Sequence, residues 1–387
     1  MRKYYAVITS LFCICLIGAA SASDRFAFVT SEGDDNLTIL DLRTEKVVKT
    51  LPTGRTPHVI AFTGAGKGYV NNRGSKDLTV IDGNTFEVIG SIALPATSFQ
   101  LALSPDGKTL AVAYKDALAI SLIDTAADTV TKTIAVGKKP EGVFKGAMMR
   151  HSYWSNDGAY VYASDDVNDS IVKIDARTGE VKASIRMPGP THYLHPSKDA
   201  KLLYAVNEAE KQGVTSVTII DVLTDKVIKD VQIPLEAGET GSLHHGEFTK
   251  DGNYFFVCNE GGRSVAIMDA AKLEIVKTIK AGPGAGHPGI TRDGKYFFII
   301  QHRDNTVSAV DIAKQEVVRG IPVGTGKKQA HASYFTPDGK YYYMINAEDN
   351  MMNKIDVARM EVVSKMPVGK TAMFFGIKEG TEFPSTE

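Results

Sequence analysis

The chain has 387 residues, and its 44 Lys and Arg nearly balance its 45 Asp and Glu. Charges of both signs are interspersed along the chain, which argues against a nucleic-acid partner and against a polybasic membrane contact. Of the three cysteines, only Cys258 lies beyond the first 22 residues. The sequence therefore excludes a disulfide framework, and it has no CxxCH motif for covalent haem attachment.

The first residues predict an export signal. Residues 1–3 carry positive charge, residues 6–20 are mostly apolar, and residues 20–22 (Ala-Ser-Ala) form a small-residue cleavage site. The apolar run is short for a membrane span, and no later segment reaches 18 apolar residues. We therefore expect a signal peptide over residues 1–22 and a single domain over residues 23–387. The expected location is the periplasm or an equivalent compartment.

A repeating unit organises the rest of the chain. In each copy a short apolar strand ends in an aspartate, and a polar link then leads to a strand rich in Val and Ile. The eight aspartates are Asp41, Asp82, Asp124, Asp175, Asp221, Asp269, Asp311 and Asp356. Their spacing of 41 to 51 residues, with four short strands per copy, is typical of a β-propeller blade.

A second repeated signal is an Asp-Gly turn between the first two strands of each copy. It occurs at residues 104–108 (Ser-Pro-Asp-Gly-Lys) and at residues 336–340 (Thr-Pro-Asp-Gly-Lys), among others. Asp-Gly supplies the positive φ that tight hairpins need. Aromatic runs such as residues 296–298 follow directly and are read as second strands.

The two ends of the chain are complementary. The first copy opens on what should be a second strand at residues 26–30 and lacks an innermost strand. Residues 372–377 look like an innermost strand with nothing after it. Pairing these segments completes one blade and closes the ring. We therefore expect an all-β propeller of eight four-stranded blades; seven blades follow instead if the first copy is rudimentary.

The second strands resemble the YVTN-type propeller repeat, as in residues 68–72 (Gly-Tyr-Val-Asn-Asn) and 204–207 (Tyr-Ala-Val-Asn). The resemblance covers essentially the whole mature chain. It implies the fold but assigns no activity, because sites are placed on folds rather than dictated by them. Among exported propellers, the chain is similar to the d-type-haem propellers of nitrite reductases and their biosynthetic relative. It is also similar to the non-haem propeller (beta) subunit of hydrazine synthase and to the propeller chain of periplasmic amine dehydrogenases.

Histidines gather where each blade-to-blade link enters an innermost strand, beside the central channel. The candidate site residues are His58, His151, His192, His195, His244, His245, Glu247, His287 and His331. His245 with Glu247, and His287 after the glycine-rich residues 281–286, are the strongest individual candidates. Converging imidazoles could bind a metal, hold a haem or relay protons. Alternatively, each histidine packs beneath the top loops against a neighbouring blade.

The links between second and third strands should lie on the same face, where their charged residues predict a polar docking surface or a solvated rim. They carry Arg73, Lys115, Asp165, Asp166, Glu208, Glu260, Arg263, His302, Arg303, Glu348 and Asp349. Insertions at residues 140–149, 209–214 and 235–241 enlarge this rim, and long loops in a regular array are often functional. Met148, Met149, Met351 and Met352 are candidate apolar contacts for a partner. Trp154 fits a partner patch or the core equally well.

No catalytic set can be assigned, because the sequence has no GxSxG, no HExxH and no phosphate-binding glycine loop. The resemblance to hydrazine synthase implies a non-catalytic subunit of an exported redox complex of nitrogen metabolism. A multihaem c-type cytochrome would be the partner, and the anammoxosome the compartment. One alternative is a propeller that binds or makes a d-type haem non-covalently, although only Arg55, Arg73 and Arg150 come near the inner positions. The other is a scaffold or ligand-binding propeller without a redox role.

Overall fold

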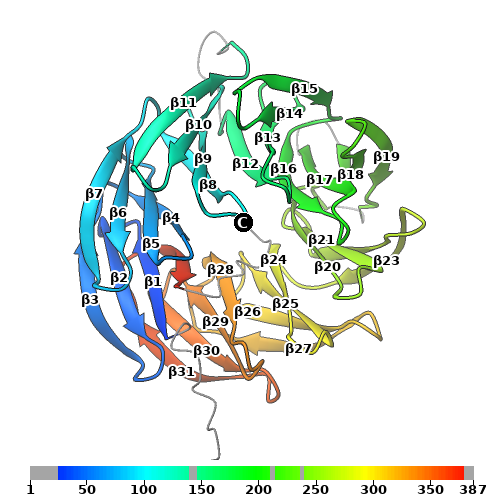
Figure 1. Ribbon diagram of the computed structural model, residues 1–387. Coiled ribbons are helices and arrows are strands. Elements are labelled where there is room, and N and C mark those ends of the chain that lie inside the picture. The colour runs from blue at the N-terminus through cyan, green and yellow to red at the C-terminus, as the bar shows by residue number, and fades with distance from the viewer. Residues whose placement is uncertain (1–24, 139–145, 210–213, 236–238, 379–387) are drawn as a thin grey trace, which may run out of the picture.

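The chain folds into a ring of eight four-stranded antiparallel sheets (Figure 1). The computed structural model describes residues 25–138, 146–209, 214–235 and 239–378, which form 32 strands and no helix. The prediction of an all-β propeller with eight blades is confirmed, and the seven-blade alternative is wrong. The expected export signal lies outside the described residues.

Each blade runs outward from the central axis, and its strands fall into four classes. The innermost strands are β4 (Pro57–Phe62), β8 (Ser98–Leu103), β12 (Met149–Trp154), β16 (Thr191–Pro196), β20 (Leu243–Phe248), β24 (Ala285–Ile290), β28 (Gln329–Phe335) and β32 (Ala372–Ile377). The second strands are β1 (Phe26–Ser31), β5 (Lys67–Asn72), β9 (Thr109–Tyr114), β13 (Tyr160–Asp165), β17 (Leu202–Ala209), β21 (Tyr254–Asn259), β25 (Tyr296–Gln301) and β29 (Tyr341–Asn346). The third strands are β2 (Asn36–Asp41), β6 (Asp77–Asp82), β10 (Ala119–Asp124), β14 (Ser170–Asp175), β18 (Val214–Asp221), β22 (Ser264–Asp269), β26 (Thr306–Asp311) and β30 (Met351–Asp356). The outermost strands are β3 (Lys46–Pro52), β7 (Glu87–Ala93), β11 (Thr129–Ala135), β15 (Val181–Arg186), β19 (Lys226–Gln232), β23 (Glu274–Lys280), β27 (Glu316–Pro322) and β31 (Glu361–Pro367).

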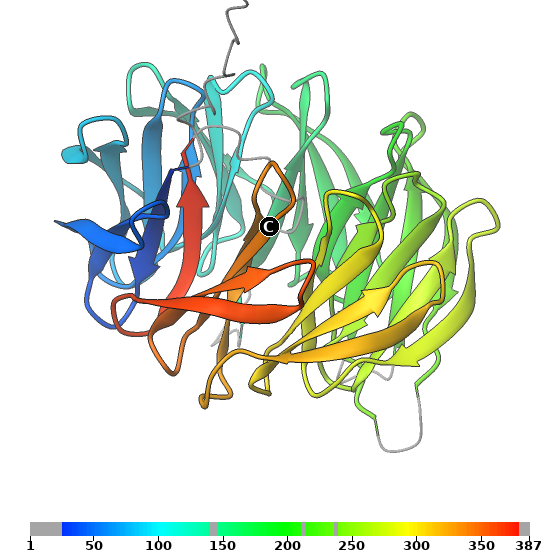
Figure 2. The same ribbon diagram turned by 90° about the horizontal axis from the view of Figure 1, so that it is seen from below.

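One blade is assembled from both ends of the chain. Its strand order is β3-β2-β1-β32, and Val29 of β1 lies opposite Phe375 of β32. In Figure 2 the red C-terminal strand lies beside the blue N-terminal strands. This pairing closes the ring as predicted, and closure removes the free edges that an open array would present.

The repeated aspartates shape the turn between third and fourth strands. Asp41 Oδ1 accepts hydrogen bonds from the backbone N–H of Arg43 at 2.9 Å and of Thr44 at 3.3 Å. Glu45 then adopts a left-handed φ of 59°. Short polar side chains commonly hold such turns by bonding the backbone two residues on. Each aspartate is therefore a turn-forming residue, which explains why it recurs in every blade.

Burial decreases from the axis to the rim. The inner strands pack apolar side chains on both faces against the adjacent blades, whereas β7 and its counterparts are exposed at most positions. Cys258 lies in this core, and burial raises the pKa of its thiol. Met148 and Met149 are also core residues, so the expectation that they contact a partner is wrong. Trp154 is buried as well, and its Nε1–H donates to the carbonyl of Ala102 at 2.9 Å.

Candidate functional site

One face of the ring carries both kinds of connection that the sequence placed there. The backbone N–H of Glu260, after β21, donates to the carbonyl of Ser242, just before β20, at 2.8 Å. In the next blade, the N–H of His302 donates to the carbonyl of Gly284 at 2.7 Å. Each link between second and third strands is thereby joined to the start of its own innermost strand. Side chains from the two positions can therefore meet at one end of the channel.

Seven imidazoles form a continuous cluster at this end, which we call the histidine mouth. Its members are His151, His192, His244, His245, His287, His302 and His331. Going round the ring in chain order, the distances between neighbouring ring centroids are 5.5, 4.1, 4.4, 3.9, 4.8 and 4.6 Å. The last pair, His302 and His331, stack with 9° between their planes. Histidines from five blades thus occupy one volume.

His58 lies at the margin of the histidine mouth. Its ring is 6.5 Å from that of His331 and 4.3 Å from that of Phe374 in the adjacent blade, and its Nδ1 contacts Glu32. Burial raises the pKa of Glu32 and lowers that of His58. His58 and Glu32 therefore form a pair at the edge of the histidine mouth, and His58 is not counted among its members.

The structure separates His195 and Glu247 from the histidine mouth. Both lie near the far ends of β16 and β20, and they contact each other, His195 Nε2 to Glu247 Oε1, at 3.3 Å. His195 Nδ1 is also 2.7 Å from the carbonyl of Pro196. A strand rises about 3.3 Å per residue, so His195 lies about 10 Å from His192 along the same strand. Glu247, which the sequence analysis named together with His245, pairs with His195 instead.

His302 enters the cluster although the sequence analysis placed it on the rim. A Cβ on Gly286 would lie 2.3 Å from His302 Cε1, so only glycine leaves room for this ring. The glycine-rich stretch before His287 therefore admits a neighbouring imidazole. The signal that could have found it was present, since both positions were predicted on one face.

A buried ion-pair network supports the first part of the histidine mouth. Arg150 Nε lies 2.5 Å from Asp166, and its Nη1 contacts Glu208. Glu208 in turn lies 2.8 Å from His192 Nδ1 and accepts a hydrogen bond from Ser242 Oγ at 2.9 Å. The guanidinium of Arg150 thus lies between the carboxyl groups of Asp166 and Glu208, and these two groups differ in protonation.

Burial raises the pKa of Asp166 to about 7, against the opposing charge of Arg150. Burial acts in the same direction on Glu208, but there His192 and Arg150 outweigh it and hold the pKa well below its usual range. Glu208 is therefore the ionised member and the one that orients His192.

Glu260 has the same role on the second part of the histidine mouth. Its carboxylate lies 3.4 Å from His244 Nε2, 3.6 Å from His302 Nδ1 and 3.5 Å from Arg303. Burial raises its pKa, but the hydrogen bond and charge of His302 outweigh that effect and leave it lowered. Carboxylates that contact the outer nitrogen of an imidazole fix its tautomer, as in many metal and acid–base sites.

Four of the imidazoles are held neutral. Burial, and then the nearness of other imidazoles, lowers the pKa of His151, His244, His245 and His287 well below the usual range. Neutral imidazole has a lone pair for a metal or a proton. Two sets of three have one nitrogen each within 4.8 Å of the others: His151 with His192 and His245, and His244 with His287 and His302. The histidine mouth can therefore coordinate a metal ion, approach a haem, or pass protons along contacting rings.

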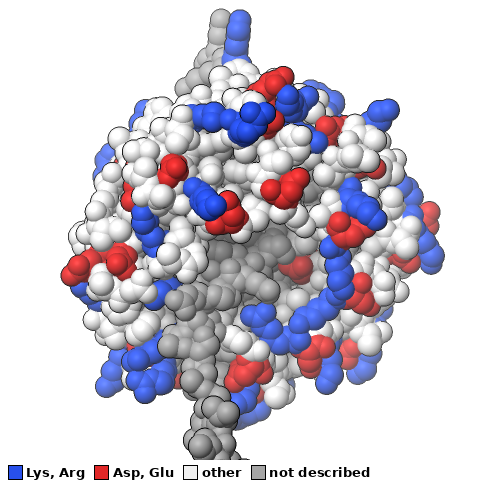
Figure 3. Space-filling model, viewed as in Figure 1, with Lys and Arg blue, Asp and Glu red and all other residues white. Residues whose placement is uncertain are grey.

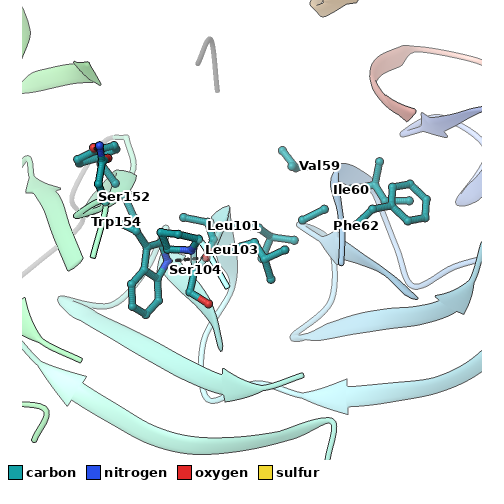
Figure 4. A pocket seen from close by; sticks show the side chains of 13 residues that line it. Val59, Ile60, Phe62, Leu101, Leu103, Ser104, Ser152 and Trp154 are labelled. Atoms are coloured by element: carbon teal, nitrogen blue, oxygen red, sulfur yellow. Dashed lines mark hydrogen bonds between the residues drawn. The ribbon is translucent and has the colours of Figure 1, made fainter. Parts of the chain in front are cut away.

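Three innermost strands line a mainly apolar cavity near their other ends, which the sequence did not predict. A cavity of about 400 Å³ lies between the innermost strands of three blades. In Figure 4, Val59, Ile60 and Phe62 of β4 and Leu101 and Leu103 of β8 line it together with Ser152 and Trp154 of β12. His58 and His151 lie on two of these strands, so the same strands carry imidazoles at one end and apolar side chains at the other.

The face of the ring seen in Figure 3 shows no dominant charge. On the face seen in Figure 3, Lys and Arg are interspersed with Asp and Glu around the ring. This agrees with the balanced composition. Within the described ranges, no helix is long and apolar enough to cross a membrane.

Two families match parts of the sequence. Residues 9–152 match the YNCE-like beta-propeller family, and residues 97–288 match the cytochrome D1 heme domain. The second match covers the four innermost strands β8 to β20, the first part of β24, and most histidines of the histidine mouth. In a comparison with curated proteins, none matches the chain.

Solved structures share the fold at low identity. Dihydro-heme d1 dehydrogenase NirN, in complex with DHE, is 19% identical over 90% of this chain and 74% of its own, with a TM-score of 0.73. Hydrazine synthase of Kuenenia stuttgartiensis is 21% identical over 78% of this chain and 96% of its own, at 0.59. A functionally unknown protein from Desulfotomaculum acetoxidans DSM 771 is 12% identical over 92% and 99%, also at 0.59. The chain is an eight-bladed β-propeller similar in sequence to the YNCE-like propellers and to the cytochrome D1 heme domain.

Proposed function

We propose that this chain is a non-catalytic propeller subunit of an exported redox complex, and that its histidine mouth faces a haem carried by a multihaem c-type cytochrome. The observation that carries the proposal is the convergence of seven imidazoles from five blades, held by ionised Glu208 and Glu260, at one end of the channel. The similarity to a haem domain and to the fold of hydrazine synthase supports the haem connection.

Within such a complex the histidine mouth would shape access and supply protons. His287 Nδ1 and His302 Nε2 lie 2.8 Å apart, and His302 Nδ1 lies 3.6 Å from Glu260. A proton can pass along this series because an imidazole can accept a proton on one nitrogen and donate one from the other. Glu260 also pairs with Arg303, whose guanidinium is half-exposed. The series therefore leads from the buried rings to the rim where a partner would dock.

A second candidate, a non-covalent d-type haem held by this chain itself, is favoured by the match of residues 97–288. Such a haem needs an axial imidazole and cations for its ring carboxylates. His192 and His331 are partly exposed and could serve as axial ligands. The carboxylate clamp fits poorly, because Arg150 is already engaged by Asp166 and Glu208, and Arg303 by Glu260. The carboxylates of a d-type haem would lie beside acidic side chains at these arginines. The residues therefore favour a haem carried by a partner.

The absorption spectrum of the purified mature chain separates the two candidates. We expect a colourless protein that co-elutes with a multihaem cytochrome from the same exported fraction. Exchanging His287 for alanine should impair the activity of the complex while the circular dichroism of the ring is retained. A Soret band that stays with the isolated chain would overturn the proposal in favour of the second candidate. Loss of folding in the His287→Ala variant would assign that residue a structural role only.

A further inference from the structure

We infer that His151, His192 and His245 form a binding site for one divalent transition-metal ion, of the zinc or copper class, in the histidine mouth. The three side chains come from three successive blades, on β12, β16 and β20. Each offers one ring nitrogen, and these nitrogens lie within 4.8 Å of one another. The inference is independent of the proposed haem partner, since it concerns only residues of this chain.

Two of the three imidazoles carry an unpartnered nitrogen in the protein interior. His151 Nδ1 and His245 Nε2 are buried and have no hydrogen-bond partner among the described residues. Their side chains are only 8% and 2% exposed. Leaving a buried polar atom unpaired costs about 1 to 3 kcal/mol, so such atoms usually have a missing partner. A metal ion between these nitrogens would satisfy both.

The third imidazole is oriented for the same purpose. Glu208 and Arg150 Nη1 each lie 2.8 Å from Nδ1 of His192, so Nε2 is the nitrogen left to bind an ion. Glu208 is itself fixed by Arg150 and by Ser242 Oγ. A carboxylate on the outer nitrogen of a ligating imidazole sets the ring's tautomer and raises its basicity. The set therefore has a supporting residue as well as three ligands.

The geometry also fits a small cation. Zinc binds imidazole nitrogen at about 2.0 to 2.1 Å, which places ligand nitrogens about 3.3 Å apart in a tetrahedron. The three ligand nitrogens lie within 4.8 Å of one another, and small rotations of the rings would bring them to that spacing. Three imidazoles without a thiolate suit zinc or copper rather than magnesium or calcium. The fourth position stays open toward His192, the only ligand of the three that is partly exposed.

The neighbouring set of His244, His287 and His302 is less suited to bind a metal ion. His287 Nδ1 and His302 Nε2 already form a hydrogen bond at 2.8 Å. His244 contacts Glu260 through Nε2, and its Nδ1 lies 2.6 Å from His245 Nδ1. Both ring nitrogens of His244 therefore already have partners, which are Glu260 and His245. We accordingly place the ion in the first set.

The test is a titration of the chelator-treated mature chain with Co²⁺, followed by its visible absorption and by displacement with Zn²⁺. We expect about one Co²⁺ per chain with the strong bands of a low-coordinate ion. His151→Ala and His245→Ala should abolish these bands. Glu208→Gln should weaken binding by roughly 10- to 100-fold. His195→Ala is the matched control, because it removes an imidazole outside the histidine mouth, and it should bind like the parent chain.

Folding of each variant is checked by circular dichroism, and His245→Gln replaces His245→Ala if the smaller side chain unfolds the ring. The inference is overturned if the parent chain binds no Co²⁺, or if a folded His151→Ala/His245→Gln chain binds it with unchanged affinity. Equal loss in the His195→Ala control would also overturn it. Haem binding gives a Soret band and no d–d bands of cobalt, so failure here is distinct from failure of the proposed function.

Discussion

Replacing Glu208 by glutamine should destabilise the ring substantially. The carboxylate interacts with Arg150, His192 and Ser242 and is four-fifths buried. Hydrogen bonds to a charged group contribute about 1.5 to 3 kcal/mol each, and glutamine keeps part of this acceptor capacity. It also leaves the Arg150 charge with Asp166 alone, a carboxyl that burial keeps partly protonated near pH 7. We expect the free energy of unfolding to fall by about 2 to 4 kcal/mol.

Urea unfolding followed by fluorescence of the single tryptophan measures this change. Glu87→Gln is the control, since Glu87 is an exposed glutamate on the outermost strand β7, and it should change stability by less than about 0.5 kcal/mol. A double-mutant cycle with Arg150→Met should show coupling, because the two residues share one network. An equal effect of both glutamate changes, or no coupling, would refute the assignment of Glu208 as the ionised support of His192.

Arg25 holds the pKa of Asp41 to about 2, so this pair contributes stability above pH 4 that is lost as the pH falls toward 2. Arg25→Gln should therefore flatten the acid limb of a stability–pH curve, and the effect should be small because the Arg25 side chain is 39% exposed. Gly286→Ala should displace His302 and destabilise by about 1 to 3 kcal/mol in urea unfolding. Trp154→Ala should cost about 3 to 5 kcal/mol in thermal unfolding and enlarge the apolar cavity.

Each of these three predictions has a control variant or a result that would contradict it. Gly320→Ala, at a glycine whose added Cβ meets nothing within 4 Å, should leave stability nearly unchanged. A parallel shift of the Arg25→Gln curve at every pH would contradict the ion-pair explanation. A Trp154→Ala chain as stable as its parent would show that the hydrogen bond to Ala102 and the surrounding packing contribute little.

The fold was predictable because several independent sequence signals indicate the same architecture. The Asp-Gly turns, the strand-ending aspartates and the complementary termini all follow local chemistry that repeats with a fixed period. The shared face of the two link types followed from strand order alone, and so did the concentration of histidines at one end.

The details of the site were not predictable, because they depend on side-chain packing between blades. His195 and Glu247 are only two or three residues from His192 and His245, yet the strand carries them toward the opposite end. His302 enters only because Gly286 has no side chain, and this contact between β24 and the link after β25 is not revealed by sequence spacing. Met148 and Met149 belong to the core, which their hydrophobicity alone could not decide.

The account depends most on the histidine mouth as the place where this chain binds its ligand. The direct measurement is histidine-selective ¹⁵N NMR of the mature chain, recorded before and after addition of Zn²⁺, with signals assigned from single His→Gln variants. The ring nitrogens of His151, His192 and His245 should shift together on addition of the metal, while those of His195 stay unchanged. Shifts that fall on His195, or on none of these three rings, would contradict the account.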